Sequence, residues 1–219
     1  MDMTGWWVHD LWNAGRSTEL VSWIFWVIAS ITLHELAHGW AAIWEGDDTP
    51  RIQGRMTANP VVHMGMPSIV VFLIVGIAWG IMPVNPYKFR HGKWGRILVS
   101  FAGPAMNLLI AIILLTILGF STGSNNPDLA QFEFFLFTGG FLNLILFSLN
   151  MLPIPPLDGS TILANLSKTI AKLYSHPQAQ IAGLLFFFAL IWSNMFNAIF
   201  QIARNVALDY AFMINGLTQ

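Results

Sequence analysis

The chain has 219 residues, of which 55% are hydrophobic and only 10% charged, whereas soluble domains carry roughly a quarter charged residues. This composition predicts an integral membrane protein with several spans, and since no linker, charge block or repeat divides it, we expect a single domain over residues 1–219. A formal net charge of −1 without a basic cluster argues against nucleic acid as a partner, and the absence of cysteine leaves His, Asp and Glu as candidate metal ligands.

The first predicted span covers residues 20–44. It contains one charged residue, Glu35, and its 25 positions are enough to cross a hydrocarbon core of about 30 Å. Residues 45–61 collect charges, Pro and Gly, which is typical of a surface connection.

The second apolar stretch, residues 62–82, is interrupted by glycines and a proline. Pro67, Gly76 and Gly80 permit the chain to enter the membrane and return, so we expect a re-entrant segment rather than a span. Basic residues flank this stretch on both sides, and the positive-inside rule therefore places both flanks in the cytoplasm. These residues are Arg51, Arg55, Lys88, Arg90, Lys93 and Arg96.

Three later apolar runs predict spans over residues 97–120, 134–152 and 181–203. The loop at 121–130 has no Lys or Arg and is expected outside the cell, while residues 160–174 are expected to form an interfacial helix. The sequence thus predicts an all-α polytopic membrane protein in the lipid bilayer, with about four full transmembrane helices, a re-entrant segment and an interfacial helix.

The sequence HELAH carries the clearest chemical signal. It places His34 and His38 one helical turn apart on the same face, the geometry that two imidazoles need to bind one zinc ion, with Glu35 beside them. The alternative is a hydrogen-bonded polar cluster between helices. An ionised carboxylate inside a span costs several kcal/mol, and ionisable groups in the membrane are by default functional, which favours the metal site.

A catalytic zinc site normally has three protein ligands and one open position, so a third ligand is required. Asp158 is the leading candidate, because it is the only acid between Glu133 and Asp209 and follows the proline-broken sequence LPIPP. The alternative is that Asp158 caps the helix expected to begin near Ser160.

On these two motifs the chain resembles the site-2 protease family of intramembrane zinc metalloproteases, over roughly residues 20–165. HELAHGW is similar to the zinc helix of that family, and NMLPIPPLDG is similar to its second motif, in which the aspartate is the third ligand. The segments GDDTP, GRMTANPVVH, MPVNPYKFR and FAGPAMNLL resemble a compact prokaryotic branch without a PDZ domain. The resemblance implies one Zn²⁺ per chain, held by His34, His38 and Asp158, and a membrane protein substrate with a transmembrane segment.

Two further polar residues are candidates for substrate positioning. The resemblance suggests this role for Asn150, with a helix-packing hydrogen bond as the alternative. His63 could contact the site as an electrophile or simply anchor its loop. Gly103 and Pro104 are expected to allow close helix approach, and Asn107 to make a structural hydrogen bond.

These residues predict hydrolysis of a peptide bond in or near a transmembrane segment, with Glu35 as the base that takes a proton from water. A substrate helix must first unwind, and a strand-like edge within residues 52–82 could hold it by backbone pairing. The alternative is a catalytically silent metal-binding membrane protein, which would not need Glu35. We expect the inner or plasma membrane of a prokaryotic cell, with the site toward the cytoplasm. HELAH and LDG can meet on one ion only if their two spans run in the same direction.

Overall fold

Three long helices form the frame of the computed structural model, which describes residues 7–122, 127–191 and 193–217. They are α2 (Ser17–Trp44), α5 (Lys93–Ser121) and α6 (Pro127–Asn150), and each contains a stretch long and apolar enough to cross a membrane. The described residues contain only helices and irregular segments. The all-α polytopic architecture is therefore confirmed.

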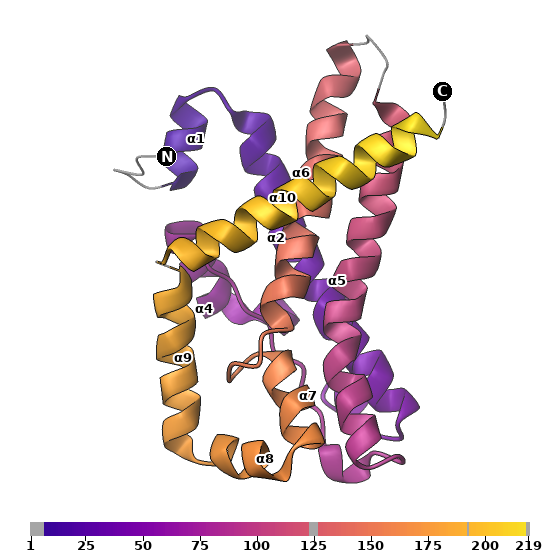
Figure 1. Cartoon of the computed structure of the whole chain (residues 1–219), viewed down its shortest axis with the longest axis vertical. Coiled ribbons are helices and arrows are strands. Elements are labelled where there is room, and N and C mark those ends of the chain that lie inside the picture. Colours follow the sequence, from indigo (N-terminus) through magenta and orange to yellow (C-terminus); the bar gives the residue numbers. More distant parts are fainter. Residues whose placement is uncertain (1–6, 123–126, 192, 218–219) are drawn as a thin grey trace.

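The direction of the three helices agrees with the prediction from the two motifs. Figure 1 shows α2 and α6 running in one direction and α5 in the other, so that α2 and α6 end at the same end of the molecule. Glycines bring the helices close together. A Cβ on Gly139 of α6 would lie 2.4 Å from the Trp26 ring of α2, and one on Gly140 would lie 2.5 Å from Leu115 of α5. Such close packing is the main source of helix association in lipid, where burying apolar surface contributes little.

The apolar stretch after α2 turns back on itself. Helix α4 (Pro60–Val75) has a break at Gly65 (φ 70°) and ends at Gly76 in the left-handed conformation. Residues 77–85 then return without helical structure. The Ser68 hydroxyl bonds both backbone polar groups of Trp79, and the amide of Ile81 donates to the carbonyl of His63 at 3.0 Å. The two arms of the segment therefore lie side by side, as expected for a re-entrant segment.

Buried carboxylates tie the return segment to the end of α2. Asp47 is fully buried and accepts hydrogen bonds from the amides of Thr49 and Asn85, at 3.0 and 2.6 Å. Burial alone would raise the pKa of this carboxyl, but the hydrogen bonds from Asn85 and Thr49 and the charge of Lys88 lower the pKa below its usual value. Glu45 likewise accepts from the amide of His91 at 3.1 Å. The connections on both sides of α4 are thus held at one end of α2.

The chain after α6 differs from the prediction in two places. The interfacial helix expected over residues 160–174 is two helices, α7 (Asp158–Leu166) and α8 (Lys168–Tyr174), because the backbone of Ser167 is extended and its side chain caps α8. The expected fourth span over residues 181–203 is divided between α9 (Pro177–Ile191) and α10 (Asn194–Gly216).

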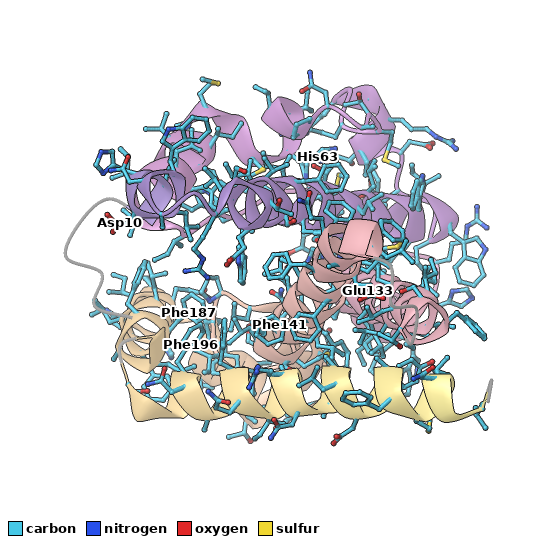
Figure 2. The ribbon with its side chains drawn as sticks, turned by 90° about the horizontal axis from the view of Figure 1, so that it is seen from above. Asp10, His63, Glu133, Phe141, Phe187 and Phe196 are labelled. Carbon is cyan, nitrogen blue, oxygen red and sulfur yellow. The ribbon has the colours of Figure 1, made fainter. Side chains whose placement is uncertain are left out.

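Helix α10 lies across the bundle rather than beside it. Figure 1 shows it crossing α5 and α6 obliquely, and in Figure 2 it lies on the side of the bundle opposite α4, with Phe141 of α6 between α10 and α2. Its alanines 203, 207 and 211 are spaced four residues apart and buried. Arg204 and Asp209 are exposed on the same helix, and crossing helices rarely carry such charges. The apolar character of residues 181–203 did not reveal this division.

Candidate metal centre

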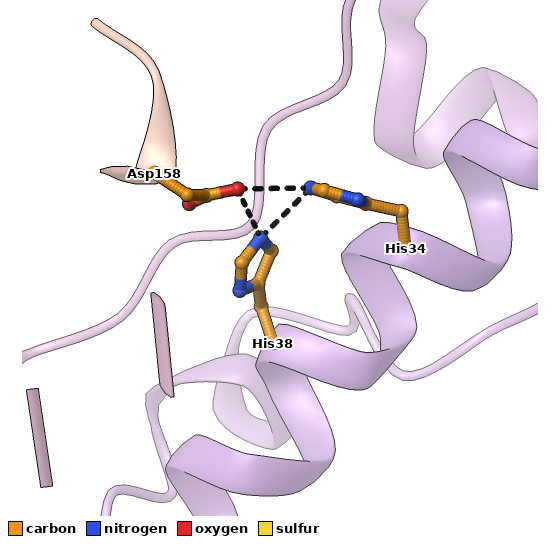
Figure 3. Close-up of side chains that lie close together, drawn as sticks. All are labelled: His34, His38 and Asp158. Carbon is orange, nitrogen blue, oxygen red and sulfur yellow. Dashed lines mark hydrogen bonds and ion pairs between the residues drawn. The ribbon is translucent and has the colours of Figure 1, made fainter. Parts of the chain in front are cut away.

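Three side chains converge where α2, α5 and α7 meet. His34 and His38 lie on α2, are less than 10% exposed, and approach each other to 3.0 Å between their Nε2 atoms. Asp158, the first residue of α7, places Oδ2 3.3 Å from His34 Nε2 and 3.4 Å from His38 Nε2. Figure 3 shows the three atoms as a small triangle. Among the described residues, this is the group of His, Asp and Glu side chains with the geometry to hold a metal ion.

The size of this triangle fits zinc. Zinc bonds of about 2.0–2.2 Å to nitrogen and oxygen place neighbouring ligand atoms about 3.3 Å apart in a tetrahedron. The three edges of 3.0, 3.3 and 3.4 Å are close to that value. The fourth vertex of the tetrahedron is the position that a catalytic site leaves open.

Hydrogen bonds behind the rings determine which nitrogens face the position that a metal ion would occupy. His34 Nδ1 lies 2.6 Å from Asn107 Oδ1, and His38 Nδ1 lies 2.6 Å from the carbonyl oxygen of Val99. Since these oxygens only accept, each Nδ1 carries the proton and each Nε2 presents a lone pair. Two lone pairs and a carboxylate oxygen thus point at one another, an arrangement that a cation stabilises.

The absence of a side chain at Gly103 keeps space open beside the donor atoms. A Cβ at this position of α5 would lie 2.4 Å from His38 Nε2 and 2.5 Å from His34 Nε2. The sequence predicted close helix approach at Gly103. The structure shows that the approach is to the two imidazoles themselves, so Gly103 borders the position that a metal would occupy.

Glu35 lies beside this group and is covered by the return segment. It is 7% exposed, and a Cβ on Gly80 would lie 2.6 Å from its Oε1 atom and 2.8 Å from Ile31. Only a glycine allows the backbone to pass so close to this carboxylate. The return segment therefore forms one wall of the site.

The alternative role for Asp158 as a helix cap has no support in the structure. The N-cap of α7 is Leu157, and no side chain makes a capping hydrogen bond there. The Asp158 carboxylate is directed to the two imidazoles instead.

The two residues expected to position substrate have other contacts. Asn150 donates to the Leu146 carbonyl of its own helix at 2.9 Å. His63 is buried, its Nε2 atom lies 2.6 Å from the carbonyl of Thr57, and it is close enough to Glu35 for the two side chains to interact electrostatically. These contacts favour the anchoring interpretation for His63. A role in substrate positioning stays a prediction for both residues.

One residue that the structure connects to the site was not predicted from the sequence. Asn143 of α6 is fully buried and bonds Asn107, which in turn bonds His34. The uncharged run 134–152 contains two amide side chains, Asn143 and Asn150, and the sequence alone does not distinguish which of them lies behind the site.

Comparisons with known proteins agree with the site. The model of peptidase family M50 matches residues 22–134 and 124–193. "Putative zinc metalloprotease YwhC" of Bacillus subtilis is 37% identical over 169 residues, covering 75% of this chain and 77% of the relative. "Putative zinc metalloprotease Rip2" of Mycolicibacterium smegmatis is 34% identical over 60% of this chain and 52% of the relative. "Zinc metalloprotease MJ0392" of Methanocaldococcus jannaschii is 29% identical over 78% of this chain and 45% of the relative. No solved structure matches the chain.

The chain belongs to peptidase family M50, the site-2 protease family. It is an intramembrane zinc metalloprotease, and zinc is its cofactor. No finding favours the catalytically silent alternative.

Proposed function

We propose that His34, His38 and Asp158 bind one Zn²⁺ and that Glu35 acts as the base that hydrolyses a peptide bond in or near a transmembrane segment of a membrane protein. The observation that carries this proposal is the convergence of three donor atoms, 3.0–3.4 Å apart, beside a buried glutamate. We further propose that residues 1–219 act as one domain, since α2, α5, α6 and α10 share an apolar core.

The chemistry divides between the ion and Glu35. When bound, zinc supplies a Lewis acid that polarises the carbonyl of the scissile bond and acidifies water. The Glu35 carboxylate accepts a proton from the water molecule whose oxygen bonds to the carbonyl carbon. It then returns this proton to the nitrogen as the carbon–nitrogen bond breaks. Asn107 and Val99 hold the Nδ1 sides of the two imidazoles, so the Nε2 atoms would be the ones to bind the ion.

An apolar groove beside α2 favours the proposal that the substrate is a transmembrane helix. It has a volume of about 590 Å³ and is lined by residues of α2 between Val21 and Leu33, together with Ala58 and Pro60. Val21, Ile28 and Glu35 are spaced seven residues apart, which places them on one face of the helix two turns from each other. A substrate helix lying in this groove would point toward Glu35.

The end of that substrate helix must unwind before it can be cut, because all its backbone groups are hydrogen-bonded in the helix. We place the unwound part against residues 77–80, which have no regular secondary structure and pass over Glu35 at Gly80. Since Pro60–Val75 is helical, the return segment after Gly76 is the part of residues 52–82 that remains for the backbone pairing expected there. Such pairing would supply affinity without a sequence requirement.

Filling the groove tests this placement of the substrate. Ile28→Trp is expected to slow cleavage of a single-span substrate about tenfold while zinc content is unchanged, because the indole occupies space needed by the substrate helix. The measurements are the initial cleavage rate in detergent and zinc by elemental analysis. Ile113→Trp is the matched control, since Ile113 is a 48% exposed isoleucine of α5 outside the groove. Equal cleavage rates in the two variants would exclude the groove.

We propose that the site faces the cytoplasm of a prokaryotic cell, in its inner or plasma membrane. Most of the Lys and Arg residues lie between α2 and α5, in the first turn of α5 or in α8. Figure 1 shows the end of α2, the start of α5 and α8 at the same end of the molecule. The positive-inside rule assigns this end to the cytoplasm. These residues are Arg51, Arg55, Lys88, Arg90, Lys93, Arg96, Lys168 and Lys172.

Single cysteines test the topology without background labelling, since the chain has none. Probes at Thr57 and His91 are expected to be labelled only when the cytoplasmic side is accessible, because both flank the re-entrant segment. A probe at Ser124, which lies outside the described residues, is expected to be labelled from the opposite side. The measurement is reaction with a membrane-impermeant maleimide in intact cells and inverted vesicles. Labelling of Thr57 and His91 from opposite sides would contradict the re-entrant segment.

A further inference from the structure

A chain of hydrogen bonds runs from a backbone carbonyl of α6 to the ring of His34. Asn143 Nδ2 donates to the Gly139 carbonyl and to Ser30 Oγ, each at 2.8 Å. Asn107 Nδ2 donates to Asn143 Oδ1 at 2.8 Å, and Asn107 Oδ1 lies 2.6 Å from His34 Nδ1. Ser30, Asn107 and Asn143 are all 0% exposed. The chain therefore joins α2, α5 and α6 out of contact with solvent.

The direction of this series of hydrogen bonds follows from the Gly139 carbonyl, where the series begins. A backbone carbonyl can only accept, so the atom of Asn143 that faces Gly139 must be the amide nitrogen. Its oxygen then faces Asn107, whose own nitrogen must point to that oxygen. The Asn107 oxygen is left to face His34, and it can be satisfied only by a protonated Nδ1. Reversing either amide would bring two acceptors or two donors together in a buried place, which is costly.

We propose that Asn107 and Asn143 are positioning residues that fix the tautomer of His34, so that its Nε2 lone pair faces the metal position before any metal binds. His38 needs no such relay, because its Nδ1 meets the carbonyl of Val99 directly. Backbone carbonyls on two different helices, Val99 on α5 and Gly139 on α6, thus determine which ring nitrogen of each imidazole carries the proton. Partners behind a metal-binding histidine typically change metal affinity by about 10–100-fold when removed.

The proposal rests on the proposed metal site, and zinc affinity is the first measurement. In the full chain purified in detergent, Asn107→Leu and Asn143→Leu are each expected to weaken zinc binding at least about tenfold, measured by competition with a chromophoric chelator. Thr116→Val is the matched control, because Thr116 makes a 3.0 Å interhelical contact from α5 to the Tyr210 hydroxyl without a link to the site. Ser30→Ala should also keep its affinity, since Asn143 retains the Gly139 carbonyl that sets the direction.

The second measurement needs neither zinc nor activity. Nitrogen NMR of histidine-labelled, metal-free protein reports which ring nitrogen carries the proton, and the His34 signal is assigned by its loss in His34→Gln. The proton is expected on Nδ1 in the unmodified chain and in Ser30→Ala, and distributed over both nitrogens in Asn143→Leu. A proton on Nε2 in the unmodified chain overturns the proposal even if the leucine variants do not fold. Wild-type zinc affinity together with an unchanged tautomer in Asn143→Leu also overturns it. Failure of the unmodified chain to bind zinc would count against the metal site alone.

Discussion

Glu35→Gln is expected to retain its zinc and to lose peptide cleavage by a factor of at least about 10², the lower end of what a positioned general base contributes. Glutamine has nearly the same shape as glutamate but cannot accept the proton of the attacking water. Glu35 is also not among the three side chains whose donor atoms converge, so removing its charge leaves the ligand set intact. The backbone at Gly80 can still pass beside an amide of this size.

The comparison requires a substrate assay and a zinc measurement on the same preparations. Glu19→Gln is a suitable control, because Glu19 lies on the same helix but pairs with Arg16 near its first turn. Normal zinc with no cleavage in Glu35→Gln, and normal values for both in Glu19→Gln, are the expected pattern. Cleavage by Glu35→Gln at the rate of the unmodified chain would refute its role as the base.

Gly103→Ala is expected to weaken zinc binding and, with it, to lower activity. The added Cβ would lie within 2.5 Å of both Nε2 atoms, and these rings cannot simply rotate away because Asn107 and Val99 hold their Nδ1 atoms. Overpacking of this kind costs about 1–3 kcal/mol, which corresponds to roughly tenfold to a hundredfold in zinc affinity. The effect should exceed that of any other single methyl group added to α5, because here the methyl borders the metal position.

Zinc affinity and circular dichroism together separate loss of the site from loss of the fold. Gly216→Ala is the matched control, since a Cβ on Gly216 meets no atom within 4 Å. Gly103→Ala with native helical content and weakened zinc binding is the expected outcome. Tight, stoichiometric binding of zinc by Gly103→Ala would show that the metal does not lie between the two imidazoles and Gly103.

Local patterns were sufficient for the parts of the fold that depend on neighbouring residues. The apolar runs located α2, α5 and α6, because a helix that crosses lipid must be predominantly apolar over its own length. The glycines and proline of residues 62–82 indicated the return, because backbone conformations such as that of Gly76 are set by the residue itself. Local patterns did not predict residues 181–203 correctly, because this apolar run is divided between the separate helices α9 and α10.

The sequence by itself determined that His34 and His38 share a helix face, since a spacing of four residues does so in any α-helix. It also determined that Glu35 accompanies them and that Asp158 is the available acid. Only the tertiary structure decided that the three donor atoms meet, that Gly103 and Gly80 leave room beside them, and that Asn143 lies behind His34. These relations join residues up to 124 positions apart, such as His34 and Asp158, and depend on how α2, α5, α6 and α7 pack. Periodicity describes one helix at a time, whereas a metal site is built from the contacts between several.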